Sequence, residues 1–262
     1  MNPAVATVLA GLVQGVLEWL PVSSEGQVSV LLSMLGGAPP ASAVSMALWL
    51  HLGTSLAAAA YLRSELAAAI RWLLRAEGGD PATFKYLLVG TAVTGVTGVP
   101  SYLLATRVPS SVALALVTPT LLTALGVALL LAEGRAVEGR PADPVKLGAL
   151  VGSLQGVAAL PGVSRSGITV LGLMLMGLEA EGALKLSFLL SVPTSLGAAG
   201  LVALTGAVEV GAAQVLSAAA AAGAGYASMH ALMRLSKRVS PGVFAVSFGL
   251  MGLAVALAVI SR

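Results

Sequence analysis

Apolar segments separated by short polar ones run through this chain from one end to the other. Six of these segments are continuous, and each is long enough to cross a bilayer as a helix, which takes roughly 20 residues. They are Ala43–Leu62, Tyr86–Thr106, Val112–Ala132, Leu186–Thr205, Ala212–Met233 and Val243–Ile260. This pattern predicts an all-α integral membrane protein with six full spans.

Two further apolar segments are interrupted near the middle. The first is Pro3–Leu35, with its interruption at Leu20–Gly26, and the second is Val145–Leu178, with its interruption at Leu160–Gly167. Proline and glycine end a helix at each interruption and leave two pieces that are short for a full crossing. We interpret both segments as re-entrant helical hairpins, which need cover from protein or from a water-filled cavity. The alternative is one kinked span followed by a loop.

The two halves of the chain resemble each other. Seven residues of the first interrupted segment recur in the second at an offset of 141, and five residues around Thr54 recur at an offset of 140. We therefore predict a first membrane repeat, 1–135, with hairpin 3–35 and three spans, and a second, 141–262, with hairpin 145–178 and three spans. Three spans between the hairpins make this an inverted-topology repeat, a design that places sites near mid-membrane.

Composition excludes several classes of protein. The chain is 57% hydrophobic and 10% charged, whereas soluble domains average about 25% charged residues. The absence of cysteine excludes disulfides, thiolate catalysis and cysteine metal sites. The net charge of +3 is small, so we expect no nucleic-acid partner. The first residues lack a basic start and contain Gln14 and Glu18, so we expect no cleaved signal peptide.

Basic residues fall mostly on one side if both hairpins re-enter. Those on the crowded side are Arg63, Arg71, Arg75, Lys85, Arg135, Arg140, Lys146, Lys185, Arg234, Lys237 and Arg238. Only Arg107 and Arg262 fall on the other side, and Arg165 lies in an interruption. By the positive-inside rule the crowded side is cytoplasmic. We therefore predict a multi-pass plasma-membrane protein with both termini outside.

Arg165 is the only charged residue between Lys146 and Glu179. An arginine at membrane depth is costly, so it needs a partner or a function. Ser164 and Ser166 flank it where a new helix begins, and the free N–H groups of a helix start bind phosphate well. The guanidinium fork also matches phosphate oxygens, which predicts a phosphate or diphosphate site. Helix capping is the alternative explanation for one serine in each interruption.

Glu18 and Glu25 are the only acidic or basic side chains in residues 1–62. Gln14 lies four residues before Glu18 and therefore on the same helix face. An intramembrane carboxylate is functional by default, and we expect Arg165 to be its counterion, although a glutamate hydrogen-bonded to a neighbouring helix is the alternative. Beside phosphate, a carboxylate can hold a divalent cation or act as general base for water or serine. Glu25 fits a metal ligand and a dipole-stabilised helix start equally well.

Two histidines, His51 and His230, lie far apart in the sequence, so a zinc cluster is not expected. We predict that His51 is an interfacial histidine rather than a catalyst, and that His230 is structural.

Four motifs carry a resemblance to a known family. Residues 14–24, Gln-Gly-Val-Leu-Glu-Trp-Leu-Pro-Val-Ser-Ser, and residues 161–169, Pro-Gly-Val-Ser-Arg-Ser-Gly-Ile-Thr, resemble the acidic and arginine motifs of the undecaprenyl-diphosphate phosphatases, also called bacitracin-resistance proteins. Ser187–Pro193 and His51–Thr54 are also similar, and the resemblance covers nearly the whole chain. It implies removal of the terminal phosphate from a C55 polyprenyl diphosphate. It also implies support from Mg²⁺ or Ca²⁺, and a site in inverted repeats that opens to the outer face.

The resemblance also assigns roles by position. Glu18 becomes the catalytic carboxylate, Ser24 a nucleophile candidate or phosphate ligand, and Arg165 the diphosphate anchor. The further substrate-binding candidates are Gln14, Ser23, Gln27, Ser164, Ser166 and Thr169. Glu18 and Glu25 are the candidate metal ligands.

Two positions depart from the family pattern. Gln27 stands where the family usually has a histidine, and Gln14 replaces what is often a second glutamate. Because glutamine cannot shuttle a proton, a mechanism that depends on histidine is excluded at position 27. Either the chemistry depends on Glu18, a hydroxyl and metal, or this member is a weak hydrolase. Glu25 is our candidate for the missing acidic group.

Three functions follow from these residues. The first is a membrane phosphatase for a polyprenyl diphosphate, with water or Ser24 as nucleophile. The second is a transporter or flippase for the polyprenyl phosphate, because paired broken helices in inverted repeats are typical of transporters. The third is a binding protein without activity. The lipid substrate and the bilayer are the expected partners, and the oligomeric state is left open between monomer and homodimer.

Overall fold

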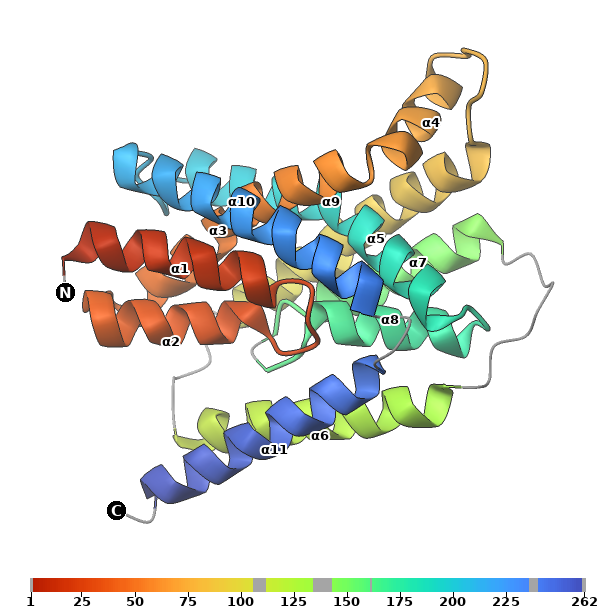
Figure 1. The fold of residues 1–262 in the computed structure, drawn as a ribbon. Helices are drawn as coiled ribbons and strands as arrows, with labels where there is room; N and C mark the ends of the chain where they lie inside the picture. The colour runs from red at the N-terminus through yellow and green to blue at the C-terminus, as the bar shows by residue number, and fades with distance from the viewer. Residues whose placement is uncertain (1, 106–111, 134–142, 161, 236–239, 261–262) are drawn as a thin grey trace. The chain divides into compact units, whose positions relative to one another are not determined.

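The computed structural model describes residues 2–105, 112–133, 143–160, 162–235 and 240–260, which form eleven α-helices and no strand (Figure 1). The helices are α1 (Pro3–Leu17), α2 (Ser24–Gly36), α3 (Pro40–Tyr61), α4 (Arg63–Leu73), α5 (Pro81–Ala105), α6 (Val112–Ala132), α7 (Pro144–Val157), α8 (Arg165–Leu175), α9 (Ala180–Leu204), α10 (Ala212–Leu235) and α11 (Pro241–Ile260). Five of them begin with proline, whose fixed φ and missing N–H suit the first helical position. The all-α prediction is confirmed for the described residues.

Four helices in the described part of the chain are long and apolar enough to cross a membrane: α3, α5 to Leu104, α9, and α11 to Ala258. They coincide with four of the six predicted spans. The other two predicted spans are also helices, α6 and α10. The described apolar part of α6, Leu116–Ala132, is shorter, and α10 is rich in alanine and glycine, which contribute little apolar surface. The chain is a helical membrane protein, while the count of six spans stays a prediction.

Each interrupted segment consists of two helices that pack on one another, α1 with α2 and α7 with α8. The first interruption ends at Ser23, whose φ of 57° lies in the left-handed region, and the second contains Gly162 at a φ of 93°. Left-handed backbone reverses the chain direction locally, at a cost of about 1–2 kcal/mol for a residue with a Cβ. Because α1 ends at Leu17 and α2 begins at Ser24, and α7 ends at Val157 and α8 begins at Arg165, each break overlaps the predicted interruption but lies two to three residues earlier in the chain. Re-entry into a membrane stays a prediction.

The chain divides into two compact units that both draw on distant parts of the sequence. The glutamate unit consists of Met1–Trp19, Ser24–Arg63 and Ser191–Arg234. The arginine unit consists of Leu20–Ser23, Ser64–Leu190 and Leu235–Arg262. These units follow spatial contacts, so they do not test the division into sequence repeats at 1–135 and 141–262.

Glycines allow close helix packing within the glutamate unit. A Cβ on Gly11 of α1 would clash with the carbonyl oxygen of Ser217, and one on Gly15 would lie 2.7 Å from the carbonyl oxygen of Ala221. Both contacts are with α10. Small residues at such positions let helix backbones approach closely, which is how helices associate within membranes.

The arginine unit has the corresponding arrangement. A Cβ on Gly152 of α7 would lie 2.5 Å from the carbonyl oxygen of Gly90, and one on Gly156 would clash with the side chain of Thr97, so α7 packs on α5. Gly152 and Gly156 are the partners of Gly11 and Gly15 at the offset of 141. In each unit, therefore, the hairpin of one predicted repeat packs on a span of the other.

We expect Gly15→Val to lower the unfolding temperature of the purified protein, because the added side chain would overlap the backbone of α10. Overpacking of this kind usually costs about 1–3 kcal/mol. Thermal unfolding in detergent, followed by tryptophan fluorescence, measures the effect. Gly223→Val on α10 is the matched control, since a Cβ added at that position would have nothing within 4 Å. Equal unfolding temperatures would contradict the packing argument.

Candidate functional site

Glu18 directly follows α1 and is buried, with 3% of its surface exposed. Its Oε2 atom accepts hydrogen bonds from Gln14 Nε2 at 2.6 Å and from Ser24 Oγ at 2.7 Å. Gln14 lies one turn earlier on the same helix face, as its spacing predicts, and is fully buried. Two donors therefore fix one oxygen of the carboxylate.

The local sequence explains how Ser24 reaches Glu18. The helix ends at Leu17, the residues around Pro21 form no helix, and the left-handed Ser23 returns the chain so that α2 begins at Ser24. The Ser24 hydroxyl then points back to the carboxylate. Ser24 is the first residue of α2, and its hydroxyl donates a hydrogen bond to Glu18.

His51 of α3 lies against the same carboxylate. Its Nε2 atom is 3.4 Å from Glu18 Oε1 and 3.5 Å from Glu25 Oε1, and its Nδ1 atom is 2.9 Å from the carbonyl oxygen of Ala47. The residue is 4% exposed. The ring is buried in the protein beside two glutamates, and its position at a membrane interface stays a prediction. A signal was present: His51 is the only acidic, basic or histidine residue between Glu25 and Arg63, and an ionisable group within a span is functional by default.

The other predicted residues of this hairpin are more accessible. Glu25 lies in the first turn of α2, with its side chain 39% exposed. Ser23 is half-buried and Gln27 is exposed. Their roles toward substrate stay predictions, as does the pairing of Glu18 with Arg165.

Ser164 and Arg165 lie at the start of α8 in the arginine unit. Ser164 is the N-cap, and its Oγ accepts a hydrogen bond from the Gly167 backbone N–H at 3.4 Å. Arg165 is the first helical residue and is half-buried. Ser166 is buried and donates its hydroxyl proton to the carbonyl oxygen of Leu20 at 2.9 Å. This hydrogen bond joins the first interruption to the start of α8, because Leu20–Ser23 belong to the arginine unit.

Thr169 is fully buried one turn into α8. Its hydroxyl oxygen is 2.9 Å from the carbonyl oxygen of Arg165 and 2.6 Å from Ser187 Oγ of α9. These contacts hold the start of α8 against α9. Ser187 was not among the predicted site residues, although it opens the Ser187–Pro193 motif. The geometry gives Thr169 a positioning role, and its contact with substrate stays a prediction.

The described residues contain no group of three or more His, Cys, Asp or Glu side chains that could hold a metal ion by themselves. Magnesium in phosphate sites is usually held by one or two carboxylates together with substrate phosphates. The Glu25 carboxylate is open enough for a cation to approach, whereas that of Glu18 is 2% exposed and already has hydrogen-bond donors on Oε2. Glu25 therefore fits a cation bound with the substrate better than Glu18 does.

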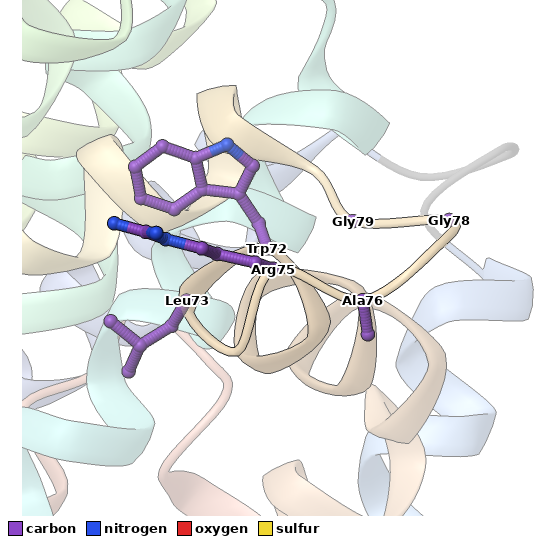
Figure 2. Close-up of a pocket in the computed structure, with 6 residues that line it drawn as sticks. All are labelled: Trp72, Leu73, Arg75, Ala76, Gly78 and Gly79. Carbon is purple, nitrogen blue, oxygen red and sulfur yellow. The ribbon is translucent and has the colours of Figure 1, made fainter.

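A separate pocket lies at the turn that follows α4 (Figure 2). It is lined by Trp72, Leu73, Arg75, Ala76, Gly78 and Gly79, and Arg75 extends beside the indole of Trp72. The exposed apolar and basic side chains are typical of a helix in the membrane interface. The pocket has no carboxylate and no predicted site residue, so we assign it no part in the chemistry.

The other end of α4 carries an ion pair between Glu65 and Lys185, with Nζ 2.5 Å from Oε1. Partial burial raises the pKa of Glu65, but hydrogen bonds from Lys185 and Ser64 outweigh it, so the pKa lies below its usual value. Both partners are partly exposed, and such pairs contribute little to stability.

Comparison with known proteins gives a consistent result. A family model described as bacitracin resistance protein BacA matches residues 7–254. A relative from Haloarcula marismortui is 40% identical over 96% of this chain and 97% of its own length. Relatives from Methanothrix thermoacetophila and Pyrobaculum islandicum are 36% and 39% identical, over 96% and 80% of this chain and equal shares of their own lengths. Each of the three is named undecaprenyl-diphosphatase.

Proposed function

Because the chain belongs to the bacitracin resistance protein BacA family, we propose that it is an integral-membrane phosphatase that hydrolyses undecaprenyl diphosphate. The products are undecaprenyl monophosphate and inorganic phosphate, so the reaction recycles a lipid carrier. Beyond the family, the observation that carries the proposal is the buried hydrogen bond from Ser24 Oγ to Glu18 Oε2. It pairs a hydroxyl with a carboxylate, both buried in a largely apolar protein.

The geometry of Ser24 and Glu18 suits general-base catalysis. A base must lie within hydrogen-bond reach of the proton that it removes, and the distance of 2.7 Å meets this condition. Glu18 takes the proton from Ser24 or from a water molecule, and the oxygen attacks the terminal phosphorus. The bond from that phosphorus to the bridging oxygen breaks, and the lipid monophosphate leaves. If Ser24 attacks, a phosphoserine forms and water hydrolyses it, so phosphate bound to Ser24 distinguishes the two routes.

The helix starts supply binding groups for the phosphates. The first N–H groups of a helix lack intrahelical partners and lie at the positive end of its dipole. Ser24 begins α2 and Arg165 begins α8, and Arg165 adds a guanidinium that can bind two phosphate oxygens at once. We assign diphosphate binding to Arg165 with Ser164 and Ser166.

We further propose that the protein works with the predicted topology, in which six spans and two re-entrant hairpins form an inverted repeat. Both termini and the site then face outside. The support is that matching glycines in the two hairpins make matching contacts with α10 and α5. The oligomeric state stays open between monomer and homodimer.

We also propose a divalent cation, Mg²⁺ or Ca²⁺, that binds with the substrate and is held by Glu25 and the phosphates. When bound, such an ion neutralises charge on phosphate oxygens. Chelation of divalent cations should therefore reduce phosphate release strongly, and added Mg²⁺ or Ca²⁺ should restore it. Glu25→Gln should raise the cation concentration needed for half-maximal activity. If turnover by this variant has an unchanged cation requirement, Glu25 is not the ligand.

The test of the proposed function is phosphate release by the purified protein from undecaprenyl diphosphate in detergent micelles. Release above that of a Glu18→Gln preparation supports a phosphatase. The transporter alternative predicts movement of the lipid across liposomes without phosphate release, and the names of the relatives do not favour it. Absence of phosphate release under all cation conditions would overturn the proposal.

A further inference from the structure

Helix α4 connects two spans and is too short to be a span itself. It begins at Arg63, two residues after α3 ends at Tyr61, and α5 follows from Pro81. Its 11 residues extend over about 16 Å, whereas the hydrocarbon core of a bilayer is about 30 Å thick. Both α3 and α5 are long and apolar enough to cross a membrane. The chain connection therefore holds α4 near the bilayer surface at which these two spans end.

The end of α4 carries large apolar side chains that the rest of the described protein leaves uncovered. Between 37% and 71% of each of four side chains is exposed, those of Ile70, Trp72, Leu73 and Leu74. The N–H of Leu74 donates to the carbonyl oxygen of Ile70, so the helical turn continues to this residue. Ile70, Leu73 and Leu74 therefore lie on one side of the helix. Such a face suits the boundary between headgroups and acyl chains, the depth that tryptophan also favours.

Two arginines border this apolar face. Arg71 and Arg75 are both exposed. Arg71 donates from Nε to the carbonyl oxygen of Gly78 at 3.3 Å, which holds it at the turn after α4. Arg75 extends beside the indole of Trp72 in the pocket of Figure 2, which Gly78 also lines. The pocket therefore combines an aromatic ring with positive charge.

The turn after α4 is packed rather than loose. The rings of Trp72 and Phe84, which belong to α4 and α5, have centroids 4.8 Å apart. A Cβ on Gly79 would lie 2.5 Å from the Cα atom of Trp72, so the chain passes close to the tryptophan. These contacts fix the indole, and Arg75 lies against a preformed surface.

The acidic side chains of this region leave the pocket basic. Glu65 pairs with Lys185 at the other end of α4. The carboxylate of Asp80 accepts hydrogen bonds from the backbone and the hydroxyl of Thr83 at the start of α5. Glu77 is exposed in the turn and does not line the pocket. The two arginines therefore determine the charge that the pocket offers to a ligand.

We propose that the end of α4 binds an anionic phospholipid of the surrounding bilayer. Its phosphate lies at Arg75 beside Trp72, and its acyl chains lie along the exposed leucines. The guanidinium fork matches two phosphate oxygens, and basic residues beside a membrane attract anionic lipids. A zwitterionic lipid has the same phosphate, but it also carries a cation that the arginines repel. This lipid site uses none of the residues assigned to hydrolysis, so it goes beyond the proposed function and does not depend on it.

Quenching of tryptophan fluorescence by brominated lipids measures the preference for an anionic headgroup. The full chain is placed in bilayers that contain brominated phosphatidylglycerol or brominated phosphatidylcholine. Trp19 and Trp49 are buried, and the difference between the wild type and Trp72→Phe isolates the signal of Trp72. Brominated phosphatidylglycerol should quench this signal at about one fifth of the concentration that brominated phosphatidylcholine requires, the factor expected for one basic residue at a membrane. Equal quenching by both lipids, or none by either, would overturn the proposal.

Arg75→Asn tests the assigned ligand. Arg75 has a left-handed backbone with a φ of 56°, which asparagine tolerates well, so the change removes the charge and keeps the turn. The preference for phosphatidylglycerol should fall about five-fold, to nearly equal quenching, at an unchanged unfolding temperature. Arg63→Gln is the matched control, because Arg63 is also exposed but lies about 13 Å from Trp72 along α4, beyond the screening length of about 8 Å. A folded Arg75→Asn protein that keeps the wild-type preference would contradict the assignment.

Soluble phosphate offers the same chemistry as the lipid headgroup, and competition distinguishes the two sources. Sodium phosphate and sodium chloride at equal ionic strength should weaken the preference for phosphatidylglycerol equally, because both only screen the attraction to the lipid. If inorganic phosphate abolishes the preference where chloride does not, a soluble anion occupies the pocket, and the proposal of a lipid site is overturned.

Discussion

Glu18→Gln is expected to abolish nearly all phosphate release from undecaprenyl diphosphate while the protein remains folded. Glutamine has the same shape as glutamate and still offers an oxygen to Gln14 and Ser24, so the packing around the α1 end is kept. It cannot take a proton from the attacking oxygen, and loss of a general base typically costs a factor of about 10²–10⁴. The loss should appear in kcat, because binding of the diphosphate is assigned to other residues. Single-turnover phosphate release measures it directly.

Glu209→Gln provides the matched control for this experiment. Glu209 is an exposed glutamate of the same unit, and the change removes one negative charge without touching the cluster of Glu18, Ser24 and His51. Its activity should equal that of the wild type. If Glu18→Gln keeps wild-type kcat, then Glu18 is not the base, and the hydrogen bond from Ser24 has only a structural meaning.

Much of the hairpin architecture can be predicted from local sequence. Pro21 and Gly162 lie in the breaks, four and five residues after α1 ends at Leu17 and α7 ends at Val157. Proline cannot continue a helix, and glycine tolerates a left-handed backbone. The spacing of Gln14 and Glu18 places them on one helix face, and the structure shows the expected hydrogen bond. These features depend on neighbours in sequence, which is why a pattern can indicate them.

The environment of His51 could not be predicted in the same way. Its contact with Glu18 depends on how α3 packs beside α1 and α2, and no local spacing encodes that packing. The left-handed backbone of Ser23 could not be predicted either, because serine disfavours this conformation and the surrounding structure must stabilise it. The glycines Gly11 and Gly152 matched in sequence, but only the contacts with α10 and α5 show the reason for the match.

Arg165→Ala is expected to raise the KM for undecaprenyl diphosphate and to lower kcat, because the guanidinium is assigned to the diphosphate in both the ground state and the transition state. Hydrogen bonds to charged groups contribute about 1.5–3 kcal/mol each, so loss of a bidentate contact should reduce kcat/KM by a factor of about 100 or more. Arg165→Lys keeps the charge but not the planar fork and should fall between the wild type and Arg165→Ala. Steady-state phosphate release over a range of substrate concentrations distinguishes the three proteins.

The control for this series is Lys146→Ala, which removes an exposed positive charge from α7, the other helix of the same hairpin. It should leave KM and kcat unchanged, which would show that the effect of Arg165 is not a general loss of basic charge. Inorganic diphosphate provides a second measurement, of binding rather than turnover. It should compete with substrate for binding to the wild type and to Arg165→Lys, and much more weakly for binding to Arg165→Ala. If Arg165→Ala binds diphosphate as tightly as the wild type does, the anion site lies elsewhere, and the start of α8 has only its capping role around Ser164.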